Sequence, residues 1–141
     1  MTFTFGNYEI DADIKKTAEL YESAPFITEG CSCGGCCNFE KAVTLFPQEV
    51  KAFFCALGID MRKAAEVYLL DGGEKNTFAQ YGGFCHMYGT ILRAPSDPGQ
   101  WYTVADGYHV MFTDDIALPE EGLEMPAIQM EIDFSRVPWV L

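Results

Sequence analysis

The chain has 141 residues, of which 49% are hydrophobic and 14% are aromatic. This length fits a single domain over residues 1–141, and the apolar content excludes a disordered chain because it can supply a buried core. The net charge of −12, from 21 acidic and 9 basic residues, argues against direct nucleic-acid binding, since an acidic surface repels phosphate backbones.

The sequence also indicates the cellular compartment. It contains no apolar run close to the roughly 20 residues that a membrane-spanning helix requires. Its first residues, MTFTFGNYEID, lack the basic start and the apolar segment of a secretory signal. We therefore expect a cytoplasmic protein without membrane association. Thiols stay reduced in that compartment, so the six cysteines do not predict three disulfide bonds.

The start of the chain predicts one short strand and one helix. The strand covers residues 2–5, where polar and apolar side chains alternate before a Gly-Asn turn. The helix is expected from Asp11 or Asp13, either of which could cap it, to about Glu22. The apolar residues spaced to line one face of this helix are Ile10, Ile14, Ala18 and Tyr21.

Two further helices are expected before residue 60. One begins within the cysteine-rich stretch, near Cys33, and runs through NFEKAVTL. The other has Pro47 in its first turn and ends at Gly58, a typical pair of helix boundaries. Its inner face follows an i, i+3, i+4, i+7 pattern, formed by Val50, Phe53, Phe54 and Leu57.

The second half of the chain predicts strands. Residues 66–81 have the pattern of a strand, a glycine-containing turn and a returning strand, and residues 84–94 continue in extended form. A bulge or kink is expected at Gly82-Gly83. Residues 101–113 predict two strands around a turn at 106–107, and the alternation over 128–134 predicts a strand with one acidic face.

This order of elements predicts the fold class. Helices followed by strands are typical of α+β proteins. We therefore expect a helical N-terminal half packed on one face of an antiparallel sheet, with the sheet formed mainly by the C-terminal half.

The stretch EGCSCGGCCNFEKAV, residues 29–43, holds four of the six cysteines: Cys31, Cys33, Cys36 and Cys37. If a helix begins near Cys33, three of these thiols share one of its faces, and Cys31 lies just before the first turn. The positive end of the helix dipole favours thiolate there. Zinc held by thiolates needs sulfurs about 3.8 Å apart, given Zn–S bonds of about 2.3 Å. A zinc site formed by these four cysteines is therefore one hypothesis for the stretch.

A seven-residue stretch rarely encloses a tetrahedral ion alone, so an additional ligand is expected from elsewhere. Cys85 or His86 is the candidate, and only one of them could contribute, because strand neighbours point to opposite faces. Two other interpretations stay open. Cys33 and Cys36 form a Cys-x-x-Cys pair that could exchange a disulfide, although no strand–helix–strand pattern surrounds it. Alternatively, the thiols are reduced and inert.

The cysteine motif also carries a resemblance. Together with LFPQEVKAFFCALGIDMRKAAEVYLL, YGGFCHMYGTI and FSRVPWVL, it resembles a group of short uncharacterised bacterial proteins with a Cys-x-Cys-x-x-Cys-x-Asn-Phe element. The resemblance spans most of the chain and implies no activity, substrate or catalytic residue. Cys37 is additional to the motif. The matching residues are Cys31, Cys33, Cys36, Asn38 and Phe39.

Acidic residues are concentrated in the second half, since no Lys or Arg occurs between Arg93 and Arg136. The simplest interpretation is a solvated face that maintains solubility. Such a face could also bind a basic protein partner. The candidate contact residues are Asp114, Asp115, Glu131 and Asp133.

Catalysis is not favoured, although it is not excluded. The chain has two histidines, so few side chains could act as general bases near neutral pH, and no catalytic residue is assigned. We predict a small non-catalytic protein-binding module with an acidic face. The alternatives are a zinc-binding domain that uses the Cys31–Cys37 cluster, and a thiol–disulfide oxidoreductase that uses Cys33 and Cys36. The oligomeric state stays open.

Overall fold

The computed structural model describes residues 1–97 and 99–141. Within them, an antiparallel sheet of seven strands has the order β1-β2-β4-β7-β6-β5, and β3 pairs with β4. The strands are β1 (Thr2–Phe5), β2 (Tyr8–Ala12), β3 (Glu66–Asp71), β4 (Phe78–Arg93), β5 (Tyr102–Ala105), β6 (Tyr108–Thr113) and β7 (Ala127–Pro138). The helices are α1 (Ile14–Ser23), α2 (Ile27–Gly30), α3 (Gly34–Ala42) and α4 (Gln48–Leu57), with 3₁₀ turns η1 (Val43–Leu45) and η2 (Met61–Lys63).

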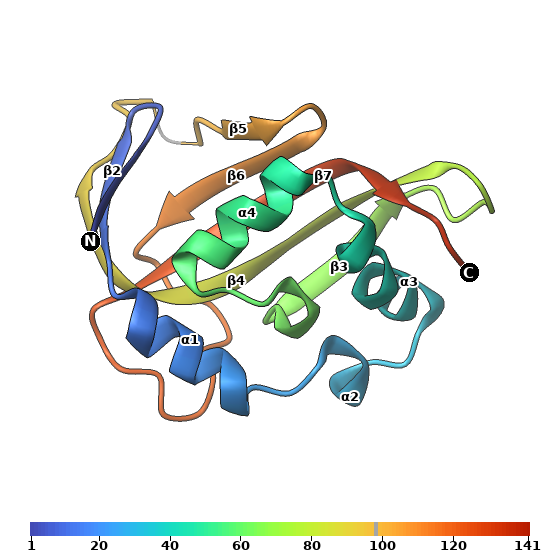
Figure 1. Cartoon of the computed structure of the whole chain (residues 1–141), viewed down its shortest axis with the longest axis horizontal. Coiled ribbons are helices and arrows are strands. Elements are labelled where there is room, and N and C mark those ends of the chain that lie inside the picture. The colour runs from blue at the N-terminus through green and yellow to red at the C-terminus, as the bar shows by residue number, and fades with distance from the viewer. Residues whose placement is uncertain (98) are drawn as a thin grey trace.

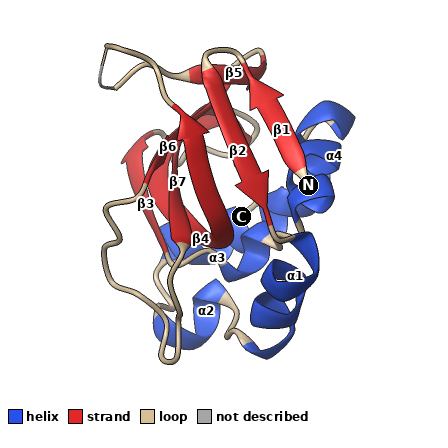
Figure 2. Cartoon of the chain, turned by 90° about the vertical axis from the view of Figure 1, so that its left-hand side faces the viewer, coloured by secondary structure: helices blue, strands red, loops and turns tan. Residues whose placement is uncertain are grey.

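Strands β4 and β7 form the centre of the sheet and run side by side across the molecule (Figure 1). The first half of β4 also pairs with β3, and its last residues pair with β2. The helices gather on one side of the sheet (Figure 2). Among the described residues, none of the helices combines the length and the apolar character needed to span a bilayer.

The prediction of a helical N-terminal half is wrong. The chain begins with an antiparallel hairpin, β1 and β2, and the first half contributes short helices to a molecule that is mainly sheet. Strand β2 was missed because Ile10 also fits the helical spacing of the residues that follow. Strand β2 pairs locally with β1 across the Gly6-Asn7 turn, and on its other side with the end of β4, where Ile10 lies opposite Ile91. Helix α1 starts one residue after Asp13, whose side chain caps it.

The predicted start of the second helix near Cys33 and the predicted end of the third helix at Gly58 are confirmed. Helix α3 ends at Ala42, however, and residues 43–45, which were predicted as part of it, form the 3₁₀ turn η1. Cys33 is the N-cap of α3, and α4 ends at Gly58, which adopts a left-handed conformation with φ of 79°. A Cβ atom at Gly58 would lie 2.7 Å from the carbonyl oxygen of Ile14, so this position also lets α4 approach α1 closely.

The bulge predicted at Gly82-Gly83 is wrong. The β4–β7 register runs regularly through both glycines and shifts between Ala79 and Tyr81 instead. The two glycines permit close approach of neighbouring groups. A Cβ atom at Gly82 would lie 2.4 Å from the ring of Tyr68, and one at Gly83 would lie 2.3 Å from a β3 carbonyl oxygen. The strand at residues 128–134 is confirmed as part of β7.

Aromatic rings join the helices to the sheet. The ring of Phe134 on β7 lies 5.0 Å from Tyr108, 5.7 Å from Phe46 and 6.2 Å from Phe54, measured between centroids. Phe39 of α3 packs edge-on against Tyr81 of β4 at 5.1 Å. This packing holds α3, and the cysteines at its start, against the central strand.

Asn38 connects α3 to the end of the chain. It is fully buried. Its amide oxygen accepts a 2.7 Å hydrogen bond from the backbone N–H of Val140, and its Nδ2 donates to the carbonyl oxygen of Pro138 at 3.1 Å. Tyr81 donates its hydroxyl to the carbonyl oxygen of Gly35 at 2.7 Å. The first turns of α3 are therefore tied to both β4 and the C-terminal segment.

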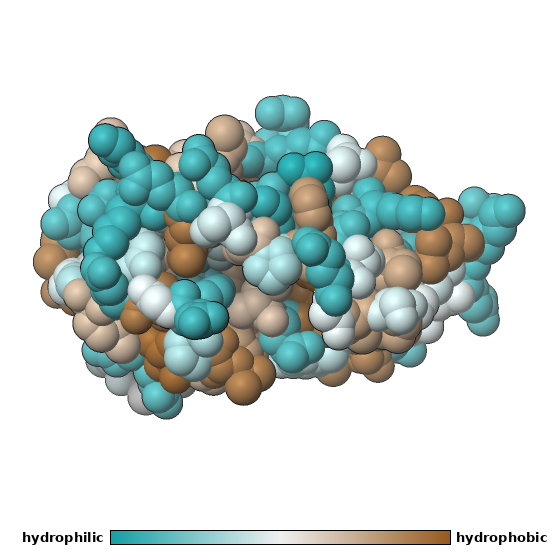
Figure 3. All heavy atoms as spheres, turned by 90° about the horizontal axis from the view of Figure 1, so that it is seen from below, coloured by the Kyte–Doolittle hydropathy of each residue, from teal (hydrophilic) through white to brown (hydrophobic). Residues whose placement is uncertain are grey.

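The side of the molecule formed by α1, α2 and the loop before β7 is seen in Figure 3. Apolar side chains are interspersed there among polar ones. Lys16 of α1 reaches across to this loop and forms a 2.9 Å ion pair with Glu124. Both side chains are exposed to solvent to a large extent, so the pair contributes little to stability.

Candidate metal centre

Three of the four clustered cysteines converge in the structure. The Sγ atoms of Cys31, Cys33 and Cys36 all lie within 4.8 Å of one another. The thiol of Cys31 is 3.3 Å from the sulfur of Cys33, which in turn accepts a 3.4 Å hydrogen bond from the backbone N–H of Cys36. A cluster of cysteines positioned to hold a metal ion is therefore present.

The local backbone explains this convergence. Cys31 ends α2 and Cys33 caps α3, and both residues have extended dihedral angles. Side chains two residues apart on an extended backbone point to the same side. An N-cap side chain in turn reaches the third residue of its helix, which here is Cys36. Two short helices separated by three residues thus place the three sulfurs together.

Contacts with the rest of the fold hold this segment in place. The carboxylate of Glu40 on α3 accepts hydrogen bonds of 3.0 Å from both the backbone N–H and the hydroxyl of Thr28, which joins α2 to α3. A Cβ atom at Gly35 would lie 3.4 Å from the Cβ atom of Leu69, so the first turn of α3 packs closely on β3. Cys36 is buried, whereas Cys31 and Cys33 are exposed, which leaves one side of the cluster open.

The three thiols differ in acidity. The hydrogen bond from the backbone N–H of Cys36, followed by that from the thiol of Cys31, lowers the pKa of Cys33 to about 7. Burial raises the pKa of Cys36 above its usual value. Cys33 is therefore present partly as thiolate at neutral pH, which is the form that binds soft metals and attacks disulfides.

The other proposed ligands lie elsewhere. Cys37 donates its thiol to the carbonyl oxygen of Ser32 at 3.5 Å and is outside the three-sulfur group. Cys85 is fully buried, and burial raises the pKa of its thiol to about 12. His86 has partners at both ring nitrogens, Glu120 and Gln129. Within the described part of the chain, none of these residues joins the cluster.

A small cavity of about 260 Å³ opens beside the cluster. Cys31 and Cys36 line it on one side, and Glu120 contributes a carboxylate to it. The sequence did not predict a role for Glu120. No local signal links it to His86, since the two residues are 34 positions apart. Most of the other lining residues are apolar: Ala24, Pro25, Phe26, Ile27, Ala64, Ala65, Val67 and Leu118.

The fully buried His86 forms an ion pair with the partly buried Glu120. Its Nδ1 lies 2.8 Å from Oε2 of Glu120, and its Nε2 lies 3.1 Å from Oε1 of Gln129. The same Gln129 oxygen accepts a 2.7 Å hydrogen bond from the backbone N–H of Ala117. Because the side-chain atom that faces Ala117 must be an acceptor, Nε2 of His86 donates to it. Both ring nitrogens therefore donate, which is the pattern of the charged imidazolium.

The pKa values of the pair agree with this pattern. Burial acts to lower the pKa of His86, but the hydrogen bond and the charge of Glu120 outweigh it, and the pKa is raised. Burial acts to raise the pKa of Glu120, but the hydrogen bond from His86 outweighs it, and the pKa is lowered. The histidine contribution to stability is complete below its ordinary pKa of 6.5, and the glutamate contribution is complete above its ordinary value of 4.5.

We expect Glu120→Gln to reduce the free energy of unfolding by about 1.5–3 kcal/mol near pH 5.5, the range typical of hydrogen bonds to charged groups. The loss should shrink as the pH rises through the raised pKa of His86, because the folded protein then no longer gains from binding that proton. Urea denaturation of both proteins at about pH 5.5 and about pH 8.5 measures this difference. An equal loss at both pH values would contradict a charged His86.

The four acidic residues proposed for partner binding are spread over two regions. Glu131 and Asp133 lie on β7, and Asp114 and Asp115 follow the end of β6. Asp114 and Glu131 line one groove, and Asp133 accepts a 2.9 Å hydrogen bond from Gln80. Nothing in this arrangement tests an interaction with a basic protein, so the acidic binding face stays a prediction.

Comparison with protein-family models, with curated proteins and with solved structures finds no match. The function proposed for the chain therefore depends on the geometry of its own residues.

Proposed function

We propose that the protein is a zinc-binding domain and that Cys31, Cys33 and Cys36 supply its metal ligands. The observation that carries this proposal is the convergence of three sulfur atoms within 4.8 Å of one another. Adjacent sulfurs around a tetrahedral zinc ion lie about 3.8 Å apart, so small side-chain rotations bring the three sulfurs to binding distance. Thiolates are soft ligands and favour zinc over the hard cations magnesium and calcium.

Three protein ligands leave one position of a tetrahedral ion free. Zinc sites with three protein ligands commonly hold a water molecule or a substrate in the fourth position. The cavity lined by Cys31, Cys36 and Glu120 offers space for such a group, and the exposure of Cys33 keeps the cluster accessible. Cys37 is the nearest further thiol in the sequence. Cys85 and His86 already have buried partners, which argues against their recruitment.

The test is a zinc titration of the reduced full-length chain. We expect about one zinc ion per chain, protection of three thiols against alkylation, and a lower melting temperature after removal of zinc by a chelator, because metal that binds only the folded state stabilises it. The thiol of Cys55 is exposed and lies outside the cluster, so it should react whether or not zinc is bound.

Absence of bound metal, with the alkylation rates of the exposed Cys31 and Cys33 unchanged by added zinc, would contradict the proposal. A reversible disulfide between Cys33 and Cys36 in protein that binds no zinc would also contradict it, and would favour the thiol–disulfide oxidoreductase instead.

A further inference from the structure

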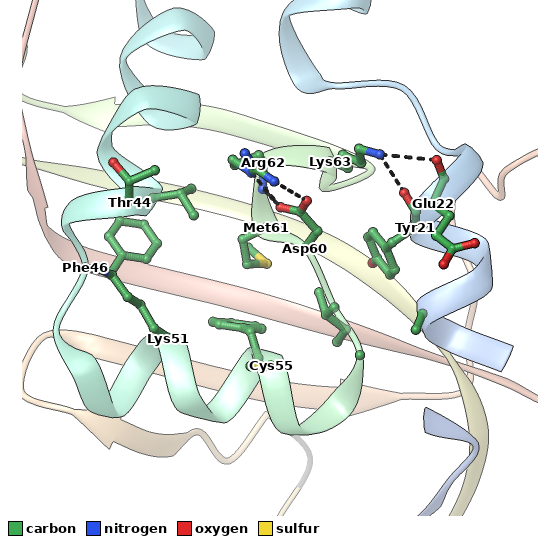
Figure 4. A pocket seen from close by; sticks show the side chains of 15 residues that line it. Tyr21, Glu22, Thr44, Phe46, Lys51, Cys55, Asp60, Met61, Arg62 and Lys63 are labelled. Atoms are coloured by element: carbon green, nitrogen blue, oxygen red, sulfur yellow. Dashed lines mark hydrogen bonds and ion pairs between the residues drawn. The ribbon is translucent and has the colours of Figure 1, made fainter. Parts of the chain in front are cut away.

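A second and larger cavity lies apart from the cysteine cluster. It has a volume of about 740 Å³, within the range of small-molecule sites. Residues of α1, η1, α4 and η2 line it, and none of the three clustered cysteines does. Figure 4 shows Lys51 and Cys55 of α4 on one side of this groove, with Arg62 and Lys63 of η2 on the other.

The floor of the groove is apolar. Its lining includes side chains whose own surfaces are almost entirely buried in the core, so the floor is fixed in shape. A ligand that covered it would remove apolar surface from water, which is the main driving force for binding in such a site. These floor residues are Tyr21, Phe46, Phe54, Ile59 and Met61.

The groove is also the place where positive charge gathers on an acidic molecule. Three of the nine basic residues line it, namely Lys51, Arg62 and Lys63. Only two of the 21 acidic residues do so, Glu22 and Asp60. The local charge is therefore opposite in sign to the charge of the whole chain, and it favours an anionic ligand.

The arrangement of these groups leaves positive charge available. Asp60 accepts hydrogen bonds from Nε and Nη2 of Arg62 at 3.0 and 2.8 Å, which fixes the guanidinium and leaves its Nη1 edge without a partner in the described residues. Lys63 is bound to the last turn of α1, where it donates to the carbonyl oxygen of Tyr21 at 2.7 Å. The side chain of Lys51 has no ion pair within the described part of the chain.

From this combination we propose that the groove binds a small amphipathic carboxylate. The apolar body of the ligand lies on the floor formed by the core side chains. Its carboxylate group binds Lys51 and the free edge of Arg62, since a guanidinium and a carboxylate form paired hydrogen bonds. The site is independent of the zinc site, and neither requires the other.

The test is calorimetric titration of the full chain with octanoate, octan-1-ol and octylammonium, which share one chain length. We expect octanoate to bind more tightly than the other two. Lys51→Glu should weaken octanoate binding by about tenfold or more, the factor expected for loss of one charge-assisted hydrogen bond. Lys15→Glu is the matched control, because it makes the same charge change at an exposed position of α1 outside the groove.

Steric filling of the groove gives a second, charge-independent test. Cys55 and Ala56 are both exposed on α4, but only Cys55 lines the groove. Cys55→Trp should therefore abolish octanoate binding, whereas Ala56→Trp should preserve it. Equal affinities for octanoate and octylammonium would overturn the proposal. Unchanged octanoate affinity in both the Lys51→Glu and the Cys55→Trp variant would also overturn it. Self-association of the chain that only Cys55→Trp abolishes would also overturn it, in favour of a second copy as occupant.

Discussion

Replacement of Cys33 by serine is expected to lower the affinity for zinc by about 100-fold or more, a loss at least as large as that seen when groups that merely orient a ligand are removed. Cys33 is the central sulfur of the cluster, 3.3 Å from Cys31 and hydrogen-bonded to the N–H of Cys36. A serine hydroxyl is a poor zinc ligand, so two protein ligands would remain. Competition against a chromophoric chelator measures the change.

Serine suits this test because it separates metal binding from folding. Cys33 is also the N-cap of α3, and serine is among the best N-cap residues, so the zinc-free protein should keep its stability. Cys55→Ser is the matched control, since it removes an exposed thiol outside the cluster and should leave zinc affinity unchanged. Equal zinc affinity of the Cys33→Ser variant and the original chain would rule out the proposed ligand set.

Replacement of Asn38 by alanine is expected to reduce the free energy of unfolding by about 3 kcal/mol. The change leaves two backbone groups without their partner, the N–H of Val140 and the carbonyl oxygen of Pro138. Each buried polar group that loses its hydrogen bond costs about 1–3 kcal/mol, and the cavity left by the side chain adds to this. Urea denaturation at neutral pH measures the loss.

Two further variants make this prediction specific. Asn7→Ala should cost little, because Asn7 is exposed and its only side-chain bond, to Gln100, is long at 3.5 Å. Asn38→Asp should cost at least as much as Asn38→Ala, because it buries a carboxylate against the carbonyl oxygen of Pro138, although it keeps an acceptor for Val140. A loss below about 1 kcal/mol for Asn38→Ala would show that the C-terminal segment does not depend on this residue.

Asn38 and Phe39 show which features the sequence reveals and which require the structure. The pair could be recognised in the sequence as part of a motif, but no pattern assigned it a role. In the structure Phe39 packs on Tyr81, and Asn38 bonds to a segment 100 residues further along the chain. The same division applies to Glu120, which acquires its role only through a contact with His86.

The sequence alone determined the features that depend on neighbours along the chain. Gly58 marked the end of α4, and the start of α1 was narrowed to Asp11 or Asp13, because capping and left-handed conformations are local properties. The alternation over residues 128–134 marked β7. The short spacing of the four cysteines was enough to predict a cluster, but only the structure showed that Cys37 lies outside it.

Only the tertiary structure decided the features that depend on distant partners. Strand β2 pairs with β1 across a local turn and with the end of β4, and only the second pairing depends on a segment far away along the chain. The 740 Å³ groove gathers Lys51 and Arg62 from different elements. Such contacts are selected by the packing of the whole chain, and packing between distant segments leaves no periodic signal in either of them.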